Sequence, residues 1–181
     1  MSVKTIIKVT LGKRLLNKRT RFLVRNKAFY NFQTAKSIAI FFNANFTEEY
    51  TVARFLSNYL CERKIKTRCL GFLKPQDVKE APTTFSGFSF FSEKDFSITG
   101  MPQSGTVMEF CTTSFDILID LHVAENYFID ALVAYSVAKM KIGIKNNDKG
   151  YYDFMIDLTG HSVTVERVVE EIKHYLNTIT S

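Results

Sequence analysis

The sequence predicts an α/β protein with three layers, in which helices cover both faces of a mainly parallel, twisted sheet, preceded by a basic N-terminal helical arm. Short apolar runs alternate along the chain with segments of helical periodicity, which is typical of a parallel sheet buried on both faces. The length of 181 residues fits one hydrophobic core. The basic charge is concentrated near the N-terminus. We therefore expect an arm over residues 1–34 and one Rossmann-like domain over residues 35–181.

The arm is predicted from charge and periodicity. The chain has 24 Lys or Arg and 18 Asp or Glu, and ten of the basic residues but none of the acidic ones precede residue 47. The remainder therefore carries 14 basic and 18 acidic side chains, a net charge of −4. Val3, Ile7, Leu11 and Leu15 recur every four residues and predict a helix over 3–16 with one apolar stripe. The very basic segment 17–26 is expected to become ordered only against the domain or a partner.

The first half of the domain reads as a βαβ unit. Residues 37–42 form a short, continuously apolar run of the kind found in central parallel strands. Asn45 and Glu48 have the spacing of a capping box, which predicts a helix that begins there and ends near Cys61. Residues 65–72 are predicted to form a second strand, parallel to the first. The connection between the two strands through the helix is expected to be right-handed, as in nearly all such units.

The middle of the domain combines an irregular segment with a buried core. All three prolines lie between residues 75 and 102, where one or two short strands are expected. Residues 115–121 form the clearest strand of the chain, apolar at its centre. The nearly all-apolar segment 127–140 after it predicts a helix packed against the sheet, and 140–144 predicts another strand.

The C-terminal segments complete the alternation. Residues 151–158 alternate apolar and polar side chains, as in a half-exposed strand near a sheet edge. The final helix carries its apolar residues at helical spacing from Val165 to Ile179, and Ser162 is its predicted N-cap. These elements together predict the sheet with helices on both faces.

Composition and missing motifs narrow the function classes. The sequence has no long uncharged apolar run, and lysines interrupt its N-terminus, so neither a membrane span nor a signal peptide is expected. Three cysteines without CxxC spacing fit reduced thiols and a cytoplasmic location. The chain lacks the GxGxxG, GxxxxGK[ST], HExxH and GxSxG motifs. We therefore assign no cofactor, metal site or catalytic residue, and whether the protein is an enzyme stays open.

Polar residues follow three of the predicted strands. In open parallel sheets, ligands bind outside the carboxyl ends of the strands, where the strand order reverses. That rule selects as ligand-binding candidates Asn43, Asn45, Asp120, His122, Glu125, Asn146 and Lys149. Asp120, His122 and Glu125 could form an acid/base or metal cluster, since a carboxylate can orient a neighbouring imidazole. The alternative is that these three residues only stabilise the loop and the helix after it.

The arm supplies a second set of candidates, its basic side chains: Lys13, Arg14, Lys18, Arg19, Arg21, Arg25 and Lys27. They could bind phosphates of RNA or DNA, or anionic lipid head groups if the apolar stripe beside them lies in a membrane interface. The alternative is a solvated helix docked on the acidic surface of the domain. A subunit of an obligate protein complex is a third possibility for the function of the whole chain.

Five segments carry a resemblance to a known family: Lys36–Ile40, Phe90–Phe96, Phe115–Leu121, Tyr151–Leu158 and Glu171–Leu176. With them the chain resembles, along nearly its whole length, a bacterial family of small proteins without an assigned function. This resemblance implies relatives and no chemistry. From the basic arm and the missing catalytic motifs, we expect a cytoplasmic binding or accessory protein, peripheral to a membrane or to nucleic acid, whose arm engages an anionic partner.

A second, partial resemblance rests on Phe115–Leu121, the helix after it and Lys141–Gly143. There the chain is similar to the N-terminal Rossmann-like half of heptosyltransferase-type glycosyltransferases. This resemblance implies, as the alternative function, a nucleotide or sugar-phosphate pocket at the strand ends. The chain departs from that pattern because Asn43–Asn45 replaces the Gly-Asp turn after the first strand, and because it has no room for the second domain of such enzymes.

Overall fold

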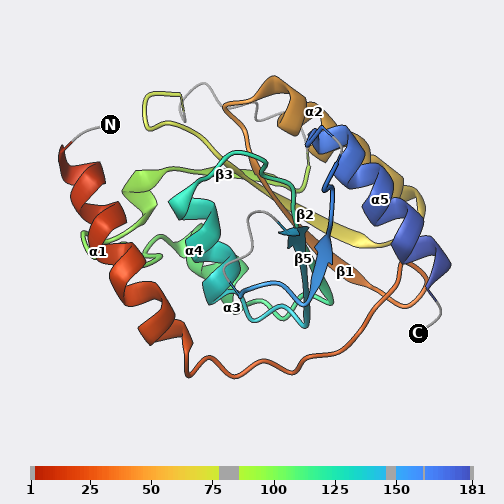
Figure 1. The fold of residues 1–181 in the computed structure, drawn as a ribbon, viewed down its shortest axis with the longest axis horizontal. Coiled ribbons are helices and arrows are strands. Elements are labelled where there is room, and N and C mark those ends of the chain that lie inside the picture. Colours follow the sequence, from red (N-terminus) through yellow and green to blue (C-terminus); the bar gives the residue numbers. More distant parts are fainter. Residues whose placement is uncertain (1–2, 78–85, 146–149, 161, 180–181) are drawn as a thin grey trace.

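The computed structural model describes residues 3–77, 86–145, 150–160 and 162–179 (Figure 1). Within them, six strands form one all-parallel sheet in the order β3-β2-β1-β4-β5-β6. The strands are β1 (Ser37–Asn43), β2 (Lys66–Phe72), β3 (Phe88–Phe91), β4 (Ile117–Asp120), β5 (Met140–Ile144) and β6 (Phe154–Ile156). This is the doubly wound order of Rossmann folds, and it reverses between β1 and β4.

The described helices surround this sheet. They are α1 (Val3–Thr20), α2 (Thr47–Glu62), α3 (Gly105–Thr112), α4 (Tyr127–Tyr135) and α5 (Val165–Thr178), with a short 3₁₀ helix, η2 (Glu93–Asp95). Helices α2 and α5 cover one face of the sheet, and α3 and α4 cover the other. The central strand β1 shows why two layers are needed, because Ile40 packs toward α2 and α5 while Phe41 packs toward α3 and α4. The predicted α/β class with three layers is confirmed.

Helix α1 lies alongside α4 and is docked there (Figure 1). Its inner side carries Val9, which packs against the core on the α4 face, and the buried Leu16. Glycine is required at position 12, because a Cβ there would overlap the hydroxyl group of Tyr127. That hydroxyl donates a 2.8 Å hydrogen bond to the carbonyl oxygen of Gly100. The arm is therefore ordered against the domain.

Several element boundaries differ from the sequence-based expectation. Helix α1 continues to Thr20, inside the segment expected to be ordered only by contacts, and contacts with the domain supply that order. Helix α4 ends at Tyr135 instead of running to 140. The buried Lys141 explains this end, since its Nζ donates to the carbonyl oxygen of Val133 at 2.6 Å and thereby caps the last turn.

The two predicted N-caps are also corrected. Asn45 does not cap α2, whose N-cap is Phe46, because the Asn45 side chain is bonded to neighbouring strand ends. Helix α5 is capped by Thr164 and not by Ser162: the Thr164 hydroxyl accepts a hydrogen bond from the amide of Arg167.

Strand β6 is shorter than the predicted 151–158. It comprises only Phe154–Ile156, because Tyr152 leaves the sheet edge and lays its ring over Gly143 of β5. Any side chain at position 143 would overlap that ring. Gly143 therefore makes room for the Tyr152 ring, whose hydroxyl reaches Asp120 at the end of β4.

Candidate ligand site at the strand ends

The end of β1 is held by amide side chains. The Asn43 Oδ1 accepts hydrogen bonds from the backbone amide of Asn45 at 3.2 Å and from its Nδ2 at 2.7 Å. The Asn45 side chain also donates to the carbonyl oxygen of Phe72 at 3.2 Å and accepts from the amide of Lys74 at 3.0 Å. Both predicted candidates therefore tie the loop after β1 to the end of β2.

A buried carboxylate spans the point where the strand order reverses. Glu49, in the first turn of α2, is only 4 % exposed. Its Oε2 accepts from the amide of Asn43 at 2.7 Å, and its Oε1 accepts from the amide of Val123, after β4, at 3.2 Å. Burial raises the pKa of this carboxyl above its usual value, and the two backbone hydrogen bonds offset only part of that rise. Two amide groups at the place where Rossmann folds bind ligands are thus occupied by a side chain of the protein itself.

A second buried network lies behind the end of β4. The His122 Nδ1 lies 2.6 Å from Asp120 Oδ1, and the Nε2 lies 3.4 Å from Asp130 Oδ1 on α4. The hydroxyl of Tyr152 donates to Asp120 Oδ2 at 2.7 Å. Burial favours the neutral imidazole, but the two carboxylates outweigh it and raise the pKa of His122 to about 10. The imidazolium is therefore held between two carboxylates.

The charged side chains of this network are buried. Asp120 and His122 are each 1 % exposed, and Asp130 is 3 % exposed. In this arrangement they offer almost no surface to a substrate. The described residues contain no group of His, Cys, Asp and Glu side chains that could hold a metal ion. The network instead connects the end of β4 with α4 and with the segment before β6.

The predicted cluster of Asp120, His122 and Glu125 is divided in the structure. Asp120 and His122 lie together, whereas Glu125 is exposed and forms a 3.0 Å ion pair with Lys13 of α1. Asn146 and Lys149, the candidates after β5, lie outside the described residues.

Three participants in these networks were missed at the sequence level: Glu49, Asp130 and Tyr152. The only available signal was an acidic residue in the first turn of each of two helices, which equally predicts a favourable interaction with the helix dipole.

The raised pKa of His122 gives a first prediction. A group whose pKa is higher in the folded state stabilises the fold fully below its unfolded pKa, about 6.5 for histidine, and loses this contribution as the pH rises through about 10. We expect ¹⁵N NMR spectra to show both ring nitrogens of His122 protonated at pH 8. A ring that titrates between pH 6 and 7 would contradict the double ion pair.

Comparisons with known proteins place the chain in a family. Residues 5–179 match a family of unknown function (DUF6913). The chain belongs to this family. No curated protein and no solved structure matches it, so the resemblance to heptosyltransferase-type enzymes is not supported, whereas the resemblance to a family without assigned function is confirmed. Among the helices described for this DUF6913 protein, none is long and apolar enough to cross a membrane.

The thiols of the DUF6913 chain are free. Cys69 and Cys111 are buried and Cys61 is exposed. Burial raises the pKa of each buried thiol to about 12, so these two cysteines are poor nucleophiles and act as apolar side chains.

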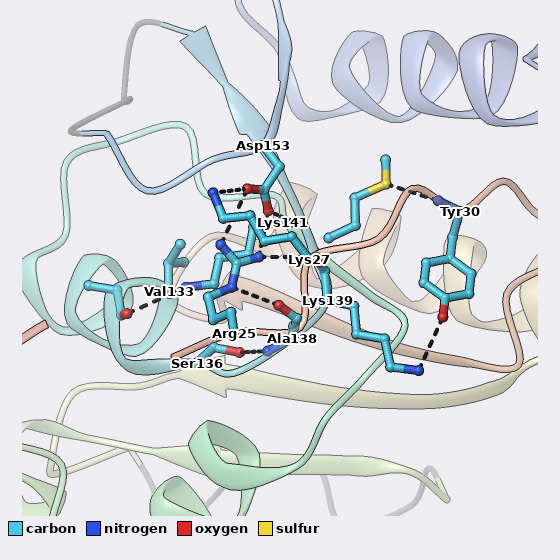
Figure 2. A network of polar contacts seen from close by, with 11 residues as sticks. Arg25, Lys27, Tyr30, Val133, Ser136, Ala138, Lys139, Lys141 and Asp153 are labelled. Carbon is cyan, nitrogen blue, oxygen red and sulfur yellow. Dashed lines mark hydrogen bonds and ion pairs between the residues drawn. The ribbon is translucent and has the colours of Figure 1, made fainter. Parts of the chain in front are cut away.

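Four of the seven arm candidates are engaged within the protein. Lys13 pairs with Glu125, and Arg19 donates to the carbonyl oxygen of Thr99 at 3.2 Å. Arg25 and Lys27 both reach Asp153, at 2.5 and 3.0 Å (Figure 2).

Figure 2 also shows Arg25 beside the carbonyl oxygen of Ala138 and Lys141 against the end of α4. Burial, and then the nearby Arg25, lower the pKa of Lys141 to about 7. These contacts fasten the segment after α1 to the start of β5. The other three candidates, Arg14, Lys18 and Arg21, are exposed.

Proposed function

We propose that this protein is a cytoplasmic accessory protein that binds an anionic membrane surface through the outer face of α1 and the residues just after it. We define this outer face by the exposed apolar and basic residues Val3, Lys4, Ile6, Ile7, Leu11, Arg14, Lys18, Arg21, Phe22 and Val24. The observation that carries the proposal is that Val3, Ile7 and Leu11 of the apolar stripe of α1 face solvent, at 74 %, 41 % and 37 % exposure.

The docking of α1 explains this exposure. The helix uses a different side, with Thr5, Gly12 and Leu16 buried, to contact the domain. Because helical residues advance by about 100° each, Ile7 and Leu11 are then turned away from α4. Phe22 and Val24 extend the apolar surface beyond the helix, at 80 % and 83 % exposure. A patch of this kind on a charged background is typical of an interaction surface.

The basic residues of the outer face favour lipid as the partner. Lys4, Arg14, Lys18 and Arg21 lie beside the apolar side chains, and in the part of the chain that the structure describes no carboxylate forms an ion pair with them. A helix lying in a membrane interface inserts apolar side chains while its lysines and arginines reach the head groups. Nucleic acid is a poorer match, because exposed aliphatic side chains gain nothing from phosphates.

The strand ends support this choice over the alternative of a nucleotide or sugar-phosphate site there. Glu49 occupies amides of Asn43 and Val123. An anionic ligand at the same amides would have to displace a buried carboxylate and would meet its negative charge. We therefore prefer a protein that works through its arm, with the sheet as the support that orients α1.

Binding to vesicles tests the proposal. Each basic side chain near an anionic surface contributes about 1 kcal/mol, so changing Arg14, Lys18 and Arg21 together to glutamine is expected to weaken binding to phosphatidylserine-containing vesicles at least tenfold. The measurement is co-sedimentation of the full chain at low and high salt. A second variant, Ile7→Ser with Leu11→Ser, is expected to weaken binding as well, and vesicles of neutral lipid should bind far less.

The matched control changes three exposed lysines outside α1 to glutamine. They are Lys36, Lys64 and Lys66, near the amino-terminal ends of β1 and β2. It removes the same charge and should leave binding unchanged. Equal losses in both triple variants would show attraction by net charge alone. Salt-sensitive binding to single-stranded RNA, without binding to vesicles, would contradict the membrane proposal and would identify nucleic acid as the partner.

A further inference from the structure

A cavity of about 700 Å³ lies between α1, the end of β2, η2 and the start of α4. Its volume falls within the roughly 300–1,000 Å³ of typical small-molecule sites. Phe72 and Lys74 line it from the end of β2, and Phe128 lines it from the first turn of α4. The cavity is therefore at the carboxyl edge of the sheet, where ligands of parallel sheets bind, but to the side of the point closed by Glu49.

The interior of the cavity is largely apolar. The rings of Phe72 and Phe128 are stacked, with centroids 5.6 Å apart and planes inclined by 11°. Val9 of α1 and Tyr127 of α4 extend this apolar wall. The Tyr127 hydroxyl donates to the carbonyl oxygen of Gly100, so its polar end is already bonded. The wall therefore suits a hydrocarbon chain or a ring system.

Charged residues at the rim leave an excess of positive charge. Three lysines and two carboxylates line the cavity. Glu125 pairs with Lys13, and Glu93 accepts from the Thr5 hydroxyl at 2.5 Å. The other two lysines, Lys74 and Lys94, are exposed and have no ion pair with any carboxylate in the described ranges. Both ammonium groups are therefore available to an anionic group at the rim.

We infer that the cavity binds a small amphiphilic anion, with its apolar body against Phe72 and Phe128 and a single carboxylate or phosphate at Lys74 and Lys94. A free amphiphile in solution and one released from a membrane would make the same apolar and ionic contacts. The inference does not depend on membrane binding, because neither lysine belongs to the outer face of α1.

Calorimetry with the full chain tests this site in buffer without vesicles. The probes are decanoate and decyl phosphate below their micelle concentrations, with decanol as the neutral probe. At least one of the two anions should bind, and decanol should bind at least tenfold more weakly. Changing Lys74 and Lys94 together to glutamine is expected to weaken binding of the anion at least tenfold, and raising the salt concentration should weaken it further.

Two further variants separate the site from general effects. Changing Lys36 and Lys66 to glutamine removes the same charge at the other end of the strands and should leave binding unchanged. Val9→Phe fills the cavity without touching its lysines and should also abolish binding. Absence of binding by both anions, decanol binding as tight as theirs, or unchanged binding in the variant at positions 74 and 94 would each overturn the inference. Vesicle binding by the variant at positions 74 and 94 should remain, which distinguishes the two sites.

Discussion

Replacing Asp120 by alanine is expected to lower the free energy of unfolding by about 3–5 kcal/mol, the usual cost of removing one partner of a buried ion pair. Asp120 is 1 % exposed and accepts from the ring of His122, the amide of His122 and the hydroxyl of Tyr152. Without its carboxylate, the buried imidazolium loses its nearest ion-pair partner and is left with the more distant Asp130. Urea denaturation at pH 7 measures the change.

The control for this variant is Asp157→Ala. Asp157 is a carboxylate on the surface that pairs with Lys145, and its removal should change the stability little. A stability loss in Asp120→Ala no larger than in the control would contradict the structural role of the network. Vesicle binding by the folded Asp120→Ala protein should equal that of the wild type, because the outer face of α1 is untouched. A specific loss of vesicle binding would instead connect the strand ends to function.

Changing Gly12 to leucine is expected to detach α1 from the domain and to cost about 2–3 kcal/mol. Leucine favours helix formation over glycine by nearly 1 kcal/mol, so propensity alone predicts a gain. The loss is expected because a side chain at position 12 overlaps the buried ring of Tyr127, which is held by its bond to Gly100. Hydrogen exchange of the α1 amides measures the detachment.

The matched control for Gly12→Leu is Thr10→Leu. Thr10 is exposed on the same helix, so leucine there meets no neighbour. Exchange in α1 should accelerate at least tenfold in Gly12→Leu and stay unchanged in Thr10→Leu. Unchanged protection in both would mean that α1 is not held by the contact at Gly12.

The positions of the strands could be predicted because burial leaves a local signature. Residues 38–42 are buried and apolar throughout, and in 140–144 the buried Met140, Ile142 and Ile144 are apolar, as a strand between two helical layers requires. The ends of the helices were harder to predict. The early end of α4 depends on Lys141, six residues beyond the helix, and the short β6 depends on Gly143 leaving room for Tyr152. Such contacts connect different elements and leave no periodic pattern.

The candidate site shows the same division. The rule for parallel sheets identified the ends of β1 and β4, and Asn43, Asn45, Asp120 and His122 do lie there. Their use could not be predicted, because it depends on partners distant in the chain: Asp130 and Tyr152 for Asp120 and His122, and Val123 for the closing carboxylate of Glu49. Polar residues at a strand end look alike in sequence whether they face a ligand or one another.

For the arm, the sequence was enough to predict the helix, its apolar stripe and its nine basic residues without an acidic one. Which side of that helix faces the domain became clear from the contacts of the folded protein. Periodicity indicates that a helix has an apolar side, and burial of that side is the usual outcome. Here Gly12 permits a closer approach on another side, so α1 docks through Thr5, Gly12 and Leu16 and leaves Ile6 and Ile7 in solvent. The packing of the Tyr127 ring against Gly12 depends on shape at one point of contact, and hydrophobic periodicity does not encode that shape.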